Sequence, residues 1–117
     1  MFEKEIRFEL LSEVSSRKSN QVKEKEIEEI MNEIKEITKC DRIERIDDST
    51  ACYDYWDCDD EALKFFIYYK NPSRRIYLHV CISDPGDIEV IADDFENNLE
   101  DLEFFEKKLK ESGVFYY

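Results

Sequence analysis

Histidine and cysteine, the residue types of this chain that most often act in catalysis or bind metals, gather near its middle. His79, the only histidine, stands two residues before Cys81, and Cys52 and Cys58 precede both. On a strand, His79 and Cys81 lie side by side on one face, but no oxyanion-hole or orienting motif accompanies this dyad. The residue types also fit zinc, although their spacing matches no standard zinc pattern. We therefore expect a structural histidine, reduced and mostly buried cysteines, and neither a metal centre nor a cofactor.

Carboxylates are the second group of residues that could do chemistry. Five of them crowd one short stretch: Asp54, Asp57, Asp59, Asp60 and Glu61. Oxygen ligands of this kind suit Mg²⁺ and Ca²⁺, but no glycine supplies the sharp bend of an EF-hand loop. The chain also lacks the P-loop, dinucleotide-binding and HExxH motifs. Solvated acids are the interpretation we adopt, and a small metal-dependent enzyme that uses this cluster is the alternative.

The net charge of −13 is unevenly distributed along the chain. Residues 46–63 contain seven acids and no base, and residues 76–106 contain ten acids and no lysine or arginine. Such a field repels nucleic acid and anionic lipid and attracts basic proteins, although an acidic surface also favours solubility. No apolar run approaches the roughly 18 residues that span a bilayer, and no apolar signal region follows the charged first residues. We expect a cytoplasmic protein that binds neither nucleic acid nor membrane.

The acidic and aromatic surface predicts binding of a basic partner, such as a nucleic-acid-binding protein. The residues expected to contact that partner are Asp54, Trp56, Asp57, Asp59, Asp60, Glu61, Asp93, Asp94 and Glu96. In size and charge the chain resembles small acidic inhibitors of phage and archaeal-virus origin, among them anti-CRISPR proteins and DNA mimics, and it also resembles immunity proteins. This resemblance of class implies a non-enzymatic inhibitor that presents carboxylates where a nucleic acid presents phosphates.

A β-hairpin is the clearest structural signal. Residues 63–70 and 75–83 are rich in β-branched and aromatic side chains, and Pro72 presets a tight turn between them. Alternation places two apolar rows on one side, which we assign to the core: Leu63, Phe65, Ile67 and Tyr69, with Ile76, Leu78, Val80 and Ile82. If Asn71 pairs with Arg74 around the turn, three pairs face each other on the opposite side: Phe66 and His79, Tyr68 and Tyr77, and Lys64 and Cys81.

That opposite side is unusually apolar, because an antiparallel sheet with one wet face alternates apolar and polar residues. Protein interfaces are enriched in aromatic residues, and a symmetric dimer needs one self-complementary surface. We predict a homodimer through Phe66, Tyr68, Tyr77, His79 and Cys81. Cover by a helix or by the apolar tail at residues 114–117 of the same chain is the alternative.

The remaining elements complete a single domain of 117 residues. Residues 4–14 and 50–57 have the composition of strands, and residues 21–39 have the apolar stripe of a helix. Alternation at 87–92 favours a strand, whereas a seven-residue repeat favours one helix over 85–111. The repeat consists of Ile88, Phe95, Leu102 and Leu109. We predict the helix, with a break near Asn97, and hence the order β-α-β-β-β-α. The expected fold is α+β, an antiparallel sheet of about four strands with two helices on one face.

Overall fold

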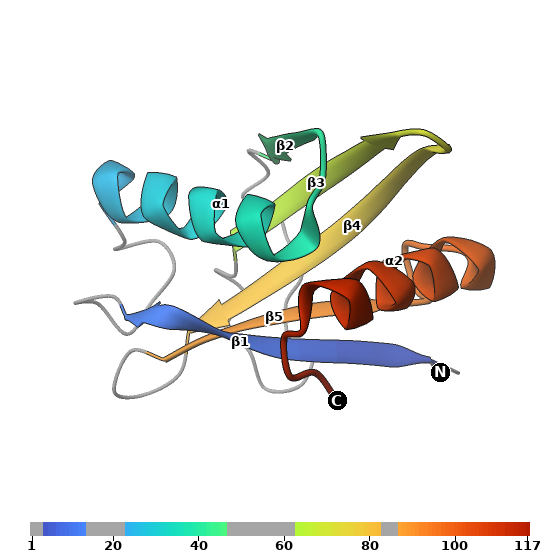
Figure 1. Ribbon diagram of the computed structural model, residues 1–117. Helices are drawn as coiled ribbons and strands as arrows, with labels where there is room; N and C mark the ends of the chain where they lie inside the picture. Colours follow the sequence, from blue (N-terminus) through green and yellow to red (C-terminus); the bar gives the residue numbers. More distant parts are fainter. Residues whose placement is uncertain (1–3, 14–22, 47–62, 83–86) are drawn as a thin grey trace.

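The computed structural model describes residues 4–13, 23–46, 63–82 and 87–117. Within them, five antiparallel strands form one sheet, and two helices pack on one of its faces (Figure 1). The elements in chain order are β1 (Glu5–Glu13), α1 (Glu24–Thr38), β2 (Arg42–Arg45), β3 (Leu63–Lys70), β4 (Ser73–Ile82), β5 (Asp87–Asp93) and α2 (Leu99–Ser112). The predicted α+β class is confirmed, and the predicted number of strands is slightly too low. The strand predicted at 50–57 lies outside the described residues.

The strand order is β1-β5-β4-β3-β2, so β1 and β2 are the two edges of the sheet. The strands β2, β3, β4 and β5 are neighbours in the order in which they follow in the chain, and β1 lies beside β5. Between β1 and β2 the chain therefore crosses from one edge of the sheet to the other, and α1 is part of this connection (Figure 1). Alternation sends one row of each strand toward the helices, and these rows form the core with the apolar stripes of the helices. Fully buried members of the core include Phe8 on β1, Phe65 on β3, Leu78 on β4, Val90 on β5, Ile30 on α1 and Phe105 on α2.

The hairpin of β3 and β4 has the predicted faces but a different register. Its turn contains only Asn71 and Pro72, joined by a cis peptide bond, and Lys70 pairs with Ser73. The predicted pairing of Asn71 with Arg74 is therefore wrong, and every partner moves by two residues. A shift of two preserves the faces, which is why both core rows lie where they were expected. The pairs on the second face are Phe66 and Tyr77, Tyr68 and Arg75, and Lys64 and His79.

The helix predicted over residues 85–111 is wrong in its first part, where Asp87–Asp93 forms β5. This strand lies between β1 and β4. Its core row begins at Ile88, and its second face is exposed at Asp87, half-buried at Glu89 and buried at Ile91. The burial of Ile91 produces a continuous apolar run over residues 90–92, which obscures the alternation of an amphipathic strand. The seven-residue repeat does not belong to one helix. Leu102 and Leu109 lie on the buried stripe of α2, whereas Ile88 lies in β5 and Phe95, which follows the strand, is 69% exposed.

Local signals explain both ends of α2. The side chain of Asn98 caps the helix and accepts a hydrogen bond from the Asp101 N–H (2.8 Å), so the break predicted near Asn97 marks its true beginning. Gly113 ends the helix with a φ of 78°, in the left-handed region that favours glycine. The hydroxyl of Ser112 donates to the backbone carbonyl of Ile37 and ties α2 to α1. In the described parts of the chain, no helix is long and apolar enough to cross a membrane.

The last residues of the chain dock on the outer edge of β1. Tyr117 and Arg7 exchange both backbone hydrogen bonds (2.8 and 2.6 Å), the pattern of an antiparallel pair. The Tyr117 hydroxyl donates to Glu89 on β5 (2.6 Å), and the Tyr116 hydroxyl donates to Glu106 on α2 (3.2 Å). The tail therefore packs on its own domain. It lies beside β1 and not beside the hairpin, which it was considered to cover as the alternative to a dimer.

Candidate functional site

Six of the nine residues predicted to bind a partner lie outside the described part of the chain. They are Asp54, Trp56, Asp57, Asp59, Asp60 and Glu61. The predicted acidic cluster, and the metal-dependent alternative that depends on it, stay predictions. Within the described ranges, no group of three or more His, Cys, Asp or Glu side chains is arranged to hold a metal ion.

The other three, Asp93, Asp94 and Glu96, lie at the corner between β5 and α2. Asp93 is only 5% exposed and accepts a hydrogen bond from the Phe95 N–H (2.8 Å). Its burial raises its pKa to about 6, and repulsion from Glu5, Asp94 and Glu96 adds to the effect. Asp93 thus belongs to the internal structure of the corner, whereas the neighbouring Phe95 and Glu96 are exposed and accessible to a partner.

Asn97 fastens this corner to β4. Its side-chain oxygen accepts from the Tyr77 N–H (2.8 Å), and its side-chain nitrogen donates to the carbonyls of Tyr77 (3.1 Å) and Asp93 (3.0 Å). Asn97 is 8% exposed, so these three bonds satisfy backbone groups that have little access to water. A side chain thereby continues the pairing of β4 at the point where β5 ends.

The aromatic side of the hairpin, predicted to be a dimer interface, is half-buried within the chain itself. The ring of Phe66 packs edge-on against Tyr77, with ring centroids 5.6 Å apart. The guanidinium of Arg42 lies 3.9 Å from the ring centroid of Tyr68, and that of Arg75 lies 4.2 Å from that of Phe66. These arginines are a cover that was not expected from the sequence. The homodimer through Phe66, Tyr68, Tyr77, His79 and Cys81 stays a prediction.

His79 lies at the centre of the second face and is 1% exposed. Lys64 on β3 and Ile91 on β5 are its neighbours in the adjacent strands. Burial lowers the pKa of the imidazole to about 4, and the charges of Lys64 and Arg7 add to the effect. The ring is therefore neutral near pH 7.

Cys81, two residues further along β4, is disulfide-bonded. The expectation of reduced cysteines is therefore wrong for this residue, while Cys40, the other cysteine in the described part of the chain, is a buried free thiol. Because the sulfur of Cys81 carries no thiolate, it serves neither as a nucleophile beside His79 nor as a zinc ligand. The Cys–His dyad considered from the sequence does not exist in this state of the protein.

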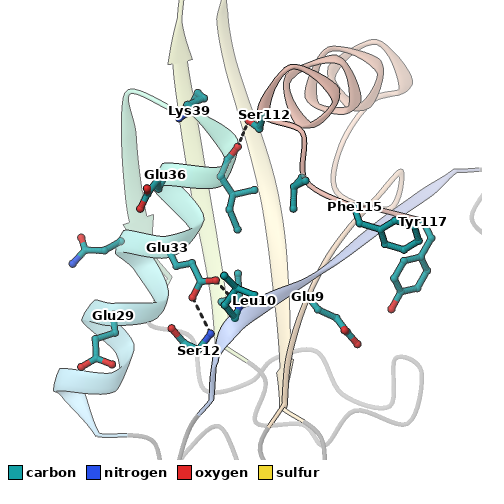
Figure 2. Close-up of a pocket in the computed structure, with 14 residues that line it drawn as sticks. Glu9, Leu10, Ser12, Glu29, Glu33, Glu36, Lys39, Ser112, Phe115 and Tyr117 are labelled. Atoms are coloured by element: carbon teal, nitrogen blue, oxygen red, sulfur yellow. Dashed lines mark hydrogen bonds between the residues drawn. The ribbon is translucent and has the colours of Figure 1, made fainter.

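A groove of about 970 Å³ runs along the outer edge of β1 (Figure 2). The strand lies at its base, α1 forms one wall, and the end of α2 with the tail forms the other. The lining residues are Glu9, Leu10, Leu11, Ser12, Glu29, Asn32, Glu33, Glu36, Ile37, Lys39, Ser112, Val114, Phe115 and Tyr117. The volume is of the size that ligand pockets have, and the groove follows the edge of a strand.

Glu33 bridges the groove from α1 to the backbone of β1. Its carboxylate accepts hydrogen bonds from the N–H groups of Leu11 (2.6 Å) and Ser12 (3.2 Å) (Figure 2). The pairing of β1 with β5 is irregular between Glu9 and Glu13, and both N–H groups turn toward the helix there. The Glu33 side chain thus satisfies two backbone N–H donors at the edge of the sheet. Inside a sheet, a neighbouring strand would satisfy such donors.

The groove is acidic on its α1 wall and apolar on the side of the tail. Glu29, Glu33 and Glu36 are spaced so that they share one face of the helix. Away from α1, Leu11 on β1 is 96% exposed and Phe115 in the tail is 80% exposed. Exposed apolar side chains next to a free strand edge are typical of surfaces that pair with another chain.

The groove was not predicted from the sequence, because its walls come from three segments that lie far apart in the chain. Two signals pointed toward it. Leu11 occupies a position of β1 that faces away from the core, directly after the buried Leu10. The apolar composition of the tail at 114–117 indicated a docked segment, but its docking place depends on pairing with a strand more than a hundred residues earlier.

No protein-family model, no curated protein and no solved structure matches this chain. Function therefore has to be inferred from the geometry and charge of its own residues. The resemblance to acidic inhibitors in size and charge stays a hypothesis.

Proposed function

We propose that this chain is a non-enzymatic interaction protein that binds a basic partner protein and inhibits it. The observation that carries the proposal is the net charge of −13 over 117 residues, with two long stretches that contain no lysine or arginine. A field of this sign attracts a positively charged surface and speeds the encounter with it. The same field repels nucleic acid and anionic lipid.

A nucleic-acid-binding protein is the partner class that fits this charge best. Such proteins bind phosphates with lysine and arginine side chains. Carboxylates presented in place of the phosphates can bind those same lysines and arginines. Exposed Glu96 beside exposed Phe95 supplies one acidic and aromatic contact. The sequence supplies a second, where Trp56 stands between Asp54 and Asp57. Aromatic side chains anchor interfaces, and the acids around them orient a basic partner.

A cytoplasmic location and a homodimer belong to the same proposal. The disulfide of Cys81 counts against the location, because disulfides persist mainly in oxidising compartments. The homodimer brings together two chains of charge −13, so added salt should tighten it by screening their repulsion.

The proposal is tested by measuring partner binding at two ionic strengths. A candidate captured from an extract at low salt is purified and titrated at about 50 and about 300 mM salt. We expect a basic protein whose affinity falls as salt rises, and a DNA duplex that competes with the acidic protein for it. The double variant Phe95→Ala, Glu96→Gln should bind at least about threefold more weakly. The matched control Glu28→Gln, at an exposed position on α1, should bind as the wild type does. A partner whose affinity changes neither with salt nor with the double substitution would refute the proposal.

A further inference from the structure

The outer edge of β1 is covered at one end and open in its middle. Arg7 exchanges backbone hydrogen bonds with Tyr117, so the backbone groups of Arg7 point away from β5. Alternation turns the N–H and C=O of Glu9 the same way. In the register of the tail, Phe115 comes opposite Glu9, but no backbone hydrogen bond joins these two described residues. The tail therefore leaves β1 at Glu9, and the edge is open there.

Beyond Glu9, a side chain stands where a neighbouring strand would lie. The Glu33 carboxylate accepts from the N–H groups of Leu11 and Ser12, as a strand carbonyl does in a sheet. Glu33 is half-buried, so its carboxylate can exchange this contact for water or a cation without being stranded in the core. The backbone of β1 from Glu9 to Leu11 can thus accept an incoming strand.

We propose that this groove binds an extended, basic peptide segment of a partner protein, which adds to the sheet beside β1. The segment pairs with the backbone of Glu9, and one of its carbonyls replaces the carboxylate of Glu33 at the N–H of Leu11. Glu33 then pairs with a lysine or arginine of the segment. Strand addition takes its affinity from main-chain hydrogen bonds and its specificity from alternate side chains. The basic character of the segment rests on the proposed function, whereas the strand addition rests on the geometry of β1.

Charge decides between a basic segment and a second copy of this chain. The lining residues include four glutamates, Glu9, Glu29, Glu33 and Glu36, and one base, Lys39. In the described part of the chain, Glu9, Glu29 and Glu36 have no ion pair. A second copy brings another charge of −13 to the same edge, which opposes the pairing of two β1 strands. A lysine- or arginine-bearing segment instead neutralises the groove.

The two walls of the groove suit the two faces of such a segment. Side chains on a strand alternate between opposite faces. One row of the segment faces the glutamates of α1 and suits lysine or arginine. The other row faces the side of Leu11 and Phe115, which are largely exposed, and suits valine or isoleucine. The fitting ligand is therefore a strand in which basic and β-branched residues alternate.

The test uses a fluorescent peptide of about eight residues that alternates lysine and valine, the length of an ordinary strand. It is titrated into the wild-type protein at about 50 mM salt, where charge pairing is weakly screened. The first control peptide has methyl groups on alternate backbone nitrogens, which preserves its charge and removes its strand pairing. It should bind at least about tenfold more weakly. The second control replaces lysine with glutamate and should not bind. Equal affinity of the methylated and unmethylated peptides overturns strand addition.

Variants at Glu9 locate the binding on the protein. Glu9→Pro removes the backbone N–H that points away from β5 and does not change the backbone groups of β1 that pair with β5. Edge strands tolerate proline at such a position. Glu9→Gln is the matched control, because it removes the charge and keeps the N–H. We expect a loss of about tenfold in affinity for the proline variant and of about threefold or less for the glutamine variant. Equal affinities of the two variants place the peptide elsewhere and overturn the proposal.

Amide hydrogen exchange on the wild-type protein keeps the test decisive if Glu9→Pro does not fold. The amide proton of Glu9 should exchange rapidly in the free protein and gain protection of about tenfold or more with the lysine–valine peptide bound. Unchanged exchange at saturating peptide overturns the proposal.

Two further outcomes separate this inference from the proposed function. A purified basic partner that binds the wild type and Glu9→Pro equally, while the peptide does not bind, overturns the groove as its site and leaves the acidic interaction protein in place. A wild-type protein that dimerises in sedimentation, and dissociates on Glu9→Pro, assigns the edge to a second copy and overturns the basic occupant.

Discussion

The substitution Asp93→Asn should stabilise the protein at neutral pH and not at acid pH. Asp93 is 5% exposed at the end of β5, and its carboxylate faces repulsion from Glu5, Asp94 and Glu96. Burial is the largest cause of the rise in its pKa from 3.8 to about 6, and the hydrogen bond from the Phe95 N–H opposes the rise. Asparagine has the same shape, keeps an oxygen that accepts this hydrogen bond, and carries no charge.

The magnitude follows from the difference between the folded and unfolded pKa values of Asp93. Because the folded pKa is the higher one, the fold disfavours the ionised form. The contribution of neutral Asp93 to the free energy of unfolding is fully present below about pH 4, and it is lost as the pH rises through about 6. A shift of about two pKa units corresponds to roughly 3 kcal/mol at 1.36 kcal/mol per unit. The asparagine amide needs a partner of its own, so we expect a gain of about 1–3 kcal/mol at about pH 7.5 and close to none at about pH 4.

Urea unfolding of wild type and Asp93→Asn at about pH 4, 5.5 and 7.5 measures this difference. The matched control is Glu28→Gln, which removes one charge from an exposed position on α1 and should change the free energy of unfolding by less than about 0.5 kcal/mol at each pH. A stability difference between wild type and Asp93→Asn that is the same at all three pH values would show that the ionisation of Asp93 is not its cause. Loss of stability at neutral pH would show that the carboxylate is favoured where it lies.

Four further outcomes follow from the other described residues. The NMR resonances of the His79 ring should titrate near pH 4 and not near 6.5, and a midpoint above about 6 contradicts the burial of the ring. The contribution of neutral His79 to the free energy of unfolding is present above about pH 6.5 and should be lost as the pH falls toward 4. Asn97→Ala should lower the free energy of unfolding by about 2–4 kcal/mol in urea, because three backbone contacts lose their partner; a loss below about 1 kcal/mol argues against these bonds. Peptide mapping without reductant should find Cys81 in a disulfide, and alkylation of Cys81 in the native protein would disprove it. Light scattering at roughly 50 micromolar should give a dimer that Tyr68→Asp with Tyr77→Asp converts to a monomer; a monomeric wild type rules the dimer out.

Local sequence patterns were sufficient to predict the buried residues of those elements in which one face is buried and the other is not. In β3 and β4, alternation identified the core rows even though the turn length, and with it the register, was misjudged. The apolar stripe of α1 faces only the core and repeats at helical spacing. In β5, the alternating core row of Ile88, Val90 and Ala92 was visible in the sequence and indicated a strand, but the seven-residue repeat was preferred. Ile91 is buried on the second face and adds an apolar residue between the members of that row, because β5 lies between β1 and β4.

The candidate site depended on long-range pairing to a greater extent. The groove exists because Tyr117 pairs with Arg7 and because Glu33 reaches the backbone at Leu11. Each contact joins segments that sequence patterns do not connect. The residue types involved, a tyrosine, an arginine and a glutamate, are ordinary surface residues in any local view.

Net charge overstates the acidic surface that a partner can meet, because some carboxylates are engaged within the chain. Glu106 accepts from Lys4 (2.8 Å), a contact that lowers the pKa of the glutamate, and Glu89 holds both Arg7 (2.9 Å) and the tail. Glu29, in contrast, lies in the groove without an ion pair among the described residues. A count of acids cannot separate these groups, since the Lys4–Glu106 contact joins residues 102 positions apart. A basic partner gains most where the charge is uncompensated, which favours the α1 wall of the groove over the paired carboxylates beside the tail.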